Sequence, residues 1–280
     1  MPRSRRKSAL FACLVIAVIA IFSGDSKNRP SFAGSTNRNP MNLFCCLSIG
    51  VHGKPPSRIA GGECVMPGEL KYIVGVMEGD SLICGGAIIS PRHILTAGHC
   101  VENPRNLNVI SGIVDINDPT RTVHKVSKVI LHPDYVPYTP TTNLERDIAL
   151  IVLKEELYLG DKLSAVQLPW YPVQLGSSAM VAGWGFTSPE NTPTSHLMKI
   201  HITFLNEKSC MEKRGWFTND RLCGYRPHGT ICGGDSGSPV VAGSVVVGIS
   251  SASTCVIGDA HVYTNVYYYR HWIIESMRKT

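Results

Sequence analysis

From residue 59 onward, the sequence consists of short apolar runs separated by turn-forming residues. Many runs are rich in valine and isoleucine and none is long enough for a typical helix, a pattern that indicates β-strands. The predicted strands lie at 72–77, 86–89, 126–131, 148–153, 180–182, 200–204, 240–241 and 245–249. Only residues 267–277, with apolar Trp272, Ile273 and Ile274, fit an amphipathic helix. The sequence therefore predicts an all-β domain that ends in one helix.

Residues 1–24 have the layout of a cleaved signal peptide. Basic residues gather at positions 3–7, an apolar run follows at 9–22, and the small residues Ser23 and Gly24 come next. The alternative is a membrane anchor, but a spanning helix needs about 20 apolar residues, and this run is shorter. We therefore expect a secreted, extracellular protein without a stable membrane anchor, whose cysteines meet an oxidising environment.

Residues 25–58 are rich in serine, asparagine, proline, glycine and arginine, which is typical of a poorly ordered pro-segment. The folded domain is then expected at 59–280. Of 27 basic and 21 acidic residues, nine basic and one acidic lie in residues 1–58, which leaves 18 basic and 20 acidic for the domain. Because the domain carries no excess of positive charge, there is no electrostatic case for nucleic-acid binding.

Three distant motifs carry residue types that can work together in hydrolysis. Ser236 lies in the run GGDSGSP, His99 in LTAGHC and Asp147 in RDIALI. A serine hydroxyl is a weak nucleophile and needs an adjacent base, which in turn needs an acid to orient it. Each motif alone is most often a turn, a loop or a cap. Their joint occurrence in the order His, Asp, Ser makes coincidence a poor explanation.

These motifs resemble those of the chymotrypsin/trypsin family of secreted serine endopeptidases, and the resemblance covers about 59–280. It implies two antiparallel six-stranded β-barrels with a C-terminal α-helix. It also implies a hydrolase that cleaves peptide bonds through an acyl-enzyme without a cofactor, with protein or peptide substrates and serine-protease inhibitors as partners.

The resemblance also assigns roles to individual residues. His99 would act as the general base and acid, and Asp147 would orient it and stabilise its charged form. The backbone N–H groups of Gly234 and Ser236 would form the oxyanion hole. Ser251 matches the serine that supports the aspartate. Two small departures, Gly98 for alanine and Ser238 for glycine, remove no catalytic group.

The same resemblance implies three disulfides, whose members are Cys84 and Cys100, Cys210 and Cys223, and Cys232 and Cys255. Cys13 would leave with the signal peptide, so Cys45, Cys46 and Cys64 remain. Neither Gln167 nor Ile200, near the places expected for a family partner of Cys64, is a cysteine. We expect Cys64 to bridge back to Cys45 or Cys46, which would hold the pro-segment on the domain after cleavage.

The run RIAGG at 58–62 resembles the family's zymogen cleavage site, with Ala60 in place of valine. Cleavage after Arg58 would free the ammonium of Ile59. In the family this ammonium pairs with the acid before the nucleophile, here Asp235, and orders the oxyanion hole. Asp235 as a simple turn former is the alternative, but it leaves the match at 58–62 unexplained.

The residue six positions before the nucleophile is an aspartate in trypsin-like members, and here it is Thr230. We therefore expect poor cleavage after lysine or arginine, and a separate trypsin-like activator for Arg58. Ser253 and His261 replace two wall glycines and should narrow the pocket, while Ala252 replaces a tryptophan. Three interpretations stay open: a shallow pocket for small aliphatic residues, an imidazolium that binds an acidic side chain, and a histidine that merely fills the pocket.

Two further possibilities concern the loss of catalytic activity and the binding of calcium. One is a catalytically weak or inactive relative that acts as a secreted binding protein; such proteins usually lack a triad member, whereas this chain keeps all three. The other is calcium binding, for which Asp115 and Asp118 come without a set of glutamates. We expect no metal site.

Overall fold

The computed structural model describes residues 62–103, 106–140, 143–185 and 194–280. The predicted signal peptide, the pro-segment and the Arg58–Ile59 bond lie outside the described residues. In the described part of the chain, no helix is both long and apolar enough to cross a membrane.

Six antiparallel strands form a first closed barrel in the order β2-β3-β4-β7-β6-β5. Their bounds are β2 Ile73–Glu78, β3 Ser81–Ile88, β4 His93–Thr96, β5 Leu107–Ser111, β6 Thr122–Leu131 and β7 Ala149–Leu153. Strands β4, β5 and β7 are buried along their whole length. Closure leaves no unpaired strand edge in the ring.

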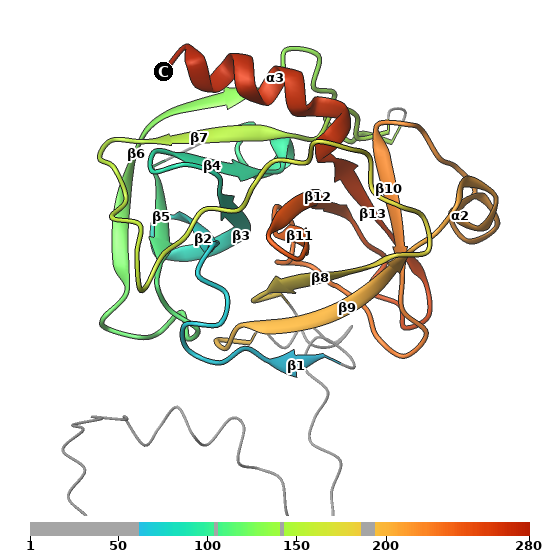
Figure 1. The fold of residues 1–280 in the computed structure, drawn as a ribbon, viewed down its shortest axis with the longest axis horizontal. Helices are drawn as coiled ribbons and strands as arrows, with labels where there is room; N and C mark the ends of the chain where they lie inside the picture. Colours follow the sequence, from blue (N-terminus) through green and yellow to red (C-terminus); the bar gives the residue numbers. More distant parts are fainter. Residues whose placement is uncertain (1–61, 104–105, 141–142, 186–193) are drawn as a thin grey trace, which may run out of the picture. The chain divides into compact units, whose positions relative to one another are not determined.

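A second set of six strands closes in the same way, because β8 pairs with both β9 and β11. The bounds are β8 Ser178–Gly183, β9 Met198–Phe204, β10 Arg221–Tyr225, β11 Pro239–Ala242, β12 Val245–Ala252 and β13 Ala260–Asn265. The short strand β1, Glu63–Cys64, is added outside β9. The predicted fold of two six-stranded antiparallel barrels is confirmed (Figure 1).

Three helical segments complete the described fold. The helix α3, Val266–Arg278, matches the predicted C-terminal helix; its first N–H groups are capped by the Asn265 side chain, and it buries Tyr269 and Ile273. The helix α2, Glu207–Arg214, was not predicted, because only Cys210 on it is buried and it lacks an apolar face. The 3₁₀ turn η2, Gly98–Cys100, contains the candidate base.

The apolar core joins the two barrels. Val241, Val246 and Ile249 of the second barrel belong to the same buried cluster as Val74, Ile94 and other side chains of the first. The loops that carry the candidate residues come from both barrels. His99 follows β4 and Asp147 precedes β7 in the first barrel, while Ser236 precedes β11 in the second.

Candidate active site

His99 and Asp147 meet because β4 and β7 are paired, with Thr96 opposite Ala149. Asp147 is fully buried. Its Oδ2 lies 2.9 Å from His99 Nδ1, and its Oδ1 accepts the backbone N–H of His99 at 2.9 Å. The carboxylate therefore fixes both the ring and the backbone of the histidine, and it favours the tautomer with a proton on Nδ1.

Two hydroxyls of the second barrel hold Asp147 in place. Ser251 Oγ donates to Asp147 Oδ2 at 2.7 Å, and Thr264 Oγ1 donates to the Asp147 carbonyl at 2.7 Å. The position of Ser251 agrees with the supporting role implied by the resemblance. The contribution of Thr264 was not anticipated from the sequence.

The pair shifts the pKa of both members in favour of charge. Burial alone would lower the pKa of His99, but the hydrogen bond and negative charge of Asp147 outweigh it, so the pKa lies above 6.5. Burial works to raise the pKa of Asp147, yet the bonds from His99 and Ser251 hold it below its usual value. The arrangement favours a charged carboxylate beneath an imidazole that readily accepts a proton.

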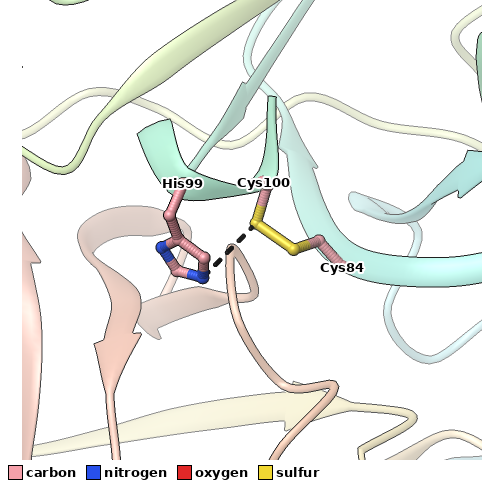
Figure 2. A group of neighbouring side chains, drawn as sticks. All are labelled: Cys84, His99 and Cys100. Atoms are coloured by element: carbon pink, nitrogen blue, oxygen red, sulfur yellow. Dashed lines mark hydrogen bonds between the residues drawn. A yellow bond between two sulfur atoms is a disulfide. The ribbon is translucent and has the colours of Figure 1, made fainter. Parts of the chain in front are cut away.

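The loop of Ser236 is tied to the loop of His99 through a disulfide. Gly85 N–H donates to the Ser236 carbonyl at 2.8 Å, and the neighbouring Cys84 is bonded to Cys100, which follows His99. Figure 2 shows this disulfide with the His99 ring, whose Nε2 lies 3.9 Å from Cys100 Sγ. Within the described residues no hydrogen bond joins Ser236 to His99, and such bonds are commonly longer before substrate binds.

Cys84, His99 and Cys100 present donor atoms within 4.8 Å of one another, which is also a spacing seen in metal sites. Here the two sulfurs are bonded to each other. A disulfide offers no thiolate, which is the form of cysteine that binds metals. The grouping is therefore structural.

The backbone on both sides of Ser236 has conformations that leave N–H groups free for an anion. Gly234 has a φ of +90° and Gly237 a φ of +74°, conformations that favour glycine. A Cβ on Gly237 would lie 2.3 Å from Thr96 Oγ1. Among the described residues, neither the N–H of Gly234 nor that of Ser236 has a protein acceptor. Both are available to a ligand oxygen.

Asp235, the residue before Ser236, is fully buried. Its carboxylate accepts the N–H groups of Gly185 at 2.9 Å and Cys232 at 3.0 Å, and no cation of the described residues pairs with it. A Cβ on Gly183 or Gly185 would lie within 2.5 Å of this carboxylate, so both positions require glycine. Burial raises the pKa of Asp235 to about 6.

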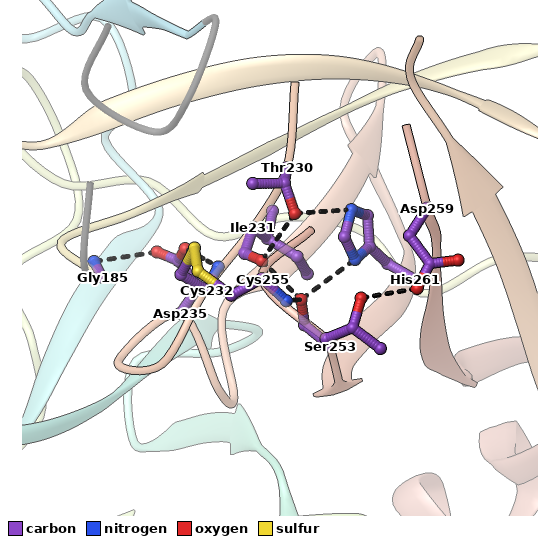
Figure 3. Close-up of a disulfide and its surroundings, with 10 residues drawn as sticks. Gly185, Thr230, Ile231, Cys232, Asp235, Ser253, Cys255, Asp259 and His261 are labelled. Carbon is purple, nitrogen blue, oxygen red and sulfur yellow. Dashed lines mark hydrogen bonds between the residues drawn. A yellow bond between two sulfur atoms is a disulfide. The ribbon is translucent and has the colours of Figure 1, made fainter. Parts of the chain in front are cut away.

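The predicted pocket residues do come together (Figure 3). The His261 ring is 1% exposed and lies between two hydroxyls: Nε2 is 3.3 Å from Thr230 Oγ1, and Nδ1 is 3.0 Å from Ser253 Oγ. Both hydroxyls also lie within hydrogen-bond distance of the Ile231 carbonyl. Because a neutral imidazole has one N–H donor and one acceptor nitrogen, one hydroxyl donates to the ring and the other donates to this carbonyl. Burial lowers the pKa of His261 to about 4. The ring is thus neutral at pH 7 and takes up space beside the equally buried Thr230.

The three disulfides implied by the resemblance are all formed. The bridge from Cys232 to Cys255 connects the loop of Asp235 to the wall that carries Ser253. Cys64 lies in β1, opposite Met198 of β9. Because Cys45 and Cys46 lie outside the described residues, their bridge to Cys64 stays a prediction.

The two small departures have different surroundings. A Cβ on Gly98 would come within 2.8 Å of the Tyr135 ring, so Tyr135 fills the space that an alanine methyl would take. The Tyr135 hydroxyl donates to Glu102 beside the site at 2.9 Å. Ser238 is fully buried, and its hydroxyl has no hydrogen-bond partner among the described residues.

Arg221 is a further residue that the sequence did not single out. It is 3% exposed, although arginine is rarely buried. Its guanidinium donates to Ser251 Oγ at 3.2 Å, and so reaches the support of Asp147. The only signal in the sequence is a charged residue directly before the apolar Leu222, which is too common to identify such a contact.

Comparison with known proteins places this geometry in a family. The family model described as Trypsin matches residues 59–273. Rat tonin is 29% identical over 85% of this chain and 97% of its own length, and human kallikrein-7 is 31% identical over 79% and 87%. The structure of mouse neuropsin, described as a serine protease, superposes with a TM-score of 0.71 at 29% identity, over 77% of this chain and 98% of that one.

Proposed function

This chain belongs to the trypsin family of serine endopeptidases, which act on proteins or peptides, and we propose that it is a secreted zymogen that cleaves after small uncharged residues. His99, Asp147 and Ser236 form its catalytic triad. The observation that carries the chemistry is the fully buried Asp147 bonded to His99 Nδ1 at 2.9 Å, because this pairing prepares Nε2 to act as a base.

In the proposed reaction, Ser236 Oγ attacks the carbonyl carbon of the scissile bond while His99 Nε2 takes its proton. The tetrahedral oxyanion accepts hydrogen bonds from the unpaired N–H groups of Gly234 and Ser236. His99 then gives its proton to the leaving amine, and an acyl-enzyme remains on Ser236. Water hydrolyses that ester by the same route. Asp147 stays ionised throughout and stabilises the imidazolium.

Activation is proposed to follow cleavage after Arg58 by a separate trypsin-like protease. The new ammonium of Ile59 would then pair with Asp235. The support is the fully buried carboxylate, which has two N–H donors and no cation among the described residues. A buried charge without a counter-ion is costly, so an arriving ammonium would be strongly favoured. Export by the 1–24 signal and regulation by serine-protease inhibitors complete the proposal.

The preference for small residues rests on the filled pocket. Thr230 has no charge to neutralise lysine or arginine, and the His261 ring occupies space that two glycines would leave open. Of the three interpretations, acid recognition is the least supported, because with a pKa near 4 the ring carries no charge at neutral pH. A shallow, uncharged pocket remains.

The test is substrate profiling of the secreted protein after cleavage at Arg58. We expect a peptide library varied at the cleavage position to show alanine and valine favoured over arginine, phenylalanine and glutamate by about 10- to 100-fold in kcat/KM. His261→Gly should open the pocket and raise cleavage after phenylalanine. Ser236→Ala serves as the inactive control.

Three outcomes separate the alternatives. Efficient cleavage after arginine would refute the pocket argument. Preference for glutamate would restore the acidic interpretation. Failure of an active-site phosphonate to label Ser236 in the activated protein would identify a non-catalytic binding protein instead.

A further inference from the structure

Arg221 begins β10 and lies opposite Thr264 of β13. Its guanidinium is held by two acceptors. One nitrogen donates to Ser251 Oγ at 3.2 Å, and another donates to the carbonyl of Leu144, three residues before Asp147. Arg221 and Thr264 therefore hold the segment of Asp147 from neighbouring strands, one through Leu144 and the other through the Asp147 carbonyl at 2.7 Å.

The bond between Arg221 and Ser251 has a fixed direction. Arginine has donors only, and the Ser251 hydroxyl has a single proton, which it gives to Asp147 Oδ2 at 2.7 Å. Ser251 therefore accepts from Arg221 and donates to Asp147. The hydrogen bonds run in one sense from Arg221 through Ser251 to Asp147, which in turn receives the His99 Nδ1–H. Successive bonds of this kind polarise one another.

We propose that Arg221 is a positioning residue of the active site, which acts through Ser251 to orient Asp147 and to keep its carboxylate charged. The inference rests on the proposed roles of His99, Asp147 and Ser236. A guanidinium that is 3% exposed is costly unless paired. Its nearest acid, Asp220, lies 3.7 Å from Nε, beyond hydrogen-bond distance. The positive charge of Arg221 therefore acts in part on the series of hydrogen bonds that runs through Ser251 and Asp147 to His99.

Other charged and titratable groups near His99 and near Arg221 also influence the pKa that a titration of His99 would measure. His99 faces Asp147 and Glu102, and Glu102 is bonded to the Tyr135 hydroxyl. Arg221 faces Asp220 and lies 5.6 Å from the centre of the Trp216 ring. Asp220 in turn accepts the hydroxyls of Thr218 at 2.6 Å and Tyr269 at 2.7 Å.

The sign of the effect on His99 follows from charge. The cation of Arg221 disfavours a second cation on His99 and makes Ser251 a stronger donor to Asp147. Both effects lower the pKa of His99 relative to a protein without Arg221. Removing the guanidinium should therefore raise that pKa, whereas loss of a purely structural contact would not move it in a defined direction.

The experiment is an NMR titration of His99 in the full secreted protein that carries Ser236→Ala, so it needs no turnover. Arg221→Met should raise the pKa of His99 by about 0.5 to 1 unit. Arg221→Lys keeps the charge and should shift it less. In a Ser251→Ala background the effect of Arg221→Met should fall by at least half. In the activated enzyme with Ser236 intact, the acid limb of kcat/KM should move with the NMR value.

An unchanged pKa in Arg221→Met, or an equal shift with and without Ser251, would overturn the proposal. If Arg221→Met does not fold, Arg221→Gln removes the charge and keeps an amide donor, and the same criteria apply to it. Because the titration is independent of catalysis, an inactive wild-type protein would contradict the proposed function without deciding the role of Arg221.

Discussion

The candidate active site contains two histidines with opposite charge preferences, a half-buried His99 and a fully buried His261. His99 is bonded to a carboxylate, Asp147, and its pKa lies above the ordinary value. His261 is bonded to the hydroxyls of Thr230 and Ser253, and its pKa falls to about 4. Burial works to lower the pKa in both cases. The difference comes from the partners.

The comparison shows how one residue type serves two purposes within the same fold. A carboxylate partner compensates the desolvation of an imidazolium, which suits His99 to accept and release a proton in the proposed reaction. Hydroxyls satisfy the ring nitrogens without supplying charge, so His261 stays neutral and fills the space beside Thr230. Three predictions test this contrast, and a fourth applies the same question of buried partners to two hydroxyls.

The largest effect is expected when the carboxylate of the first histidine is lost. Asp147→Asn keeps the shape of the side chain but removes its charge and favours the wrong tautomer of His99. We expect kcat to fall by roughly 10⁴-fold, as measured by steady-state kinetics of the activated enzyme. A fall of less than about tenfold would mean that Asp147 does not govern the histidine.

The second prediction concerns stability in acid. The pKa of His261 is about 4 in the folded protein and 6.5 ordinarily, so the unfolded chain binds the proton first as the pH falls. Above pH 6.5 the titration of His261 does not lower the free energy of unfolding. Between pH 6.5 and pH 4 it lowers this free energy progressively, by about 3 kcal/mol in total. Urea unfolding across this range should show the loss, and His261→Gln should lack it.

His99 supplies the matched control of opposite sign. Its folded pKa is raised, so its contribution to stability is complete below pH 6.5 and is lost as the pH rises through the folded pKa. His99→Gln should therefore remove a contribution that is present at low pH. The same slope for both variants would contradict the contrast between the two histidines.

The third prediction gives His261 a carboxylate partner, as His99 has. Thr230→Asp would place a carboxylate next to His261 Nε2, in place of a hydroxyl at 3.3 Å. We expect the pKa of His261 to rise by about 2 units in an NMR titration. Cleavage after arginine should stay poor, because the new carboxylate is already paired with the histidine. Thr230→Val, which adds no charge, is the control and should not raise the pKa.

The smallest effect concerns a buried hydroxyl without a partner. Ser238→Ala removes that hydroxyl and should raise the free energy of unfolding by about 1 kcal/mol. Thr96 Oγ1 is also buried but donates to the Gly85 carbonyl at 2.8 Å, so Thr96→Val should lower it by a similar amount. Denaturant unfolding of the two variants measures both changes in the free energy of unfolding. A lower value for Ser238→Ala would contradict the prediction, because it would mean that the hydroxyl makes a stabilising contact.

Much of the fold was accessible from local patterns. Runs such as 148–153 are apolar throughout, and β7 is indeed buried along its length. Strands β4, β5, β10 and β13 were not predicted, because polar residues interrupt their apolar pattern. Those residues include His93, Asn108, Arg221, His261 and Thr264, all of which are buried. A strand that contains buried polar residues lacks the apolar pattern from which strands are predicted, so its sequence resembles that of a loop.

The sequence alone determined the candidate catalytic residue types, their order along the chain and the all-β class, because short motifs and local periodicity carry this information. The pairing of the cysteines was implied by the family resemblance and not by their spacing. Only the tertiary structure decided which partners the buried polar groups obtain. Ser251 and Asp147 are 104 residues apart, and Thr230 and His261 are 31 apart. The charge of a buried group depends on such distant neighbours, and so the protonation of His261 and the contact of Arg221 with Ser251 emerge only once the barrels have closed.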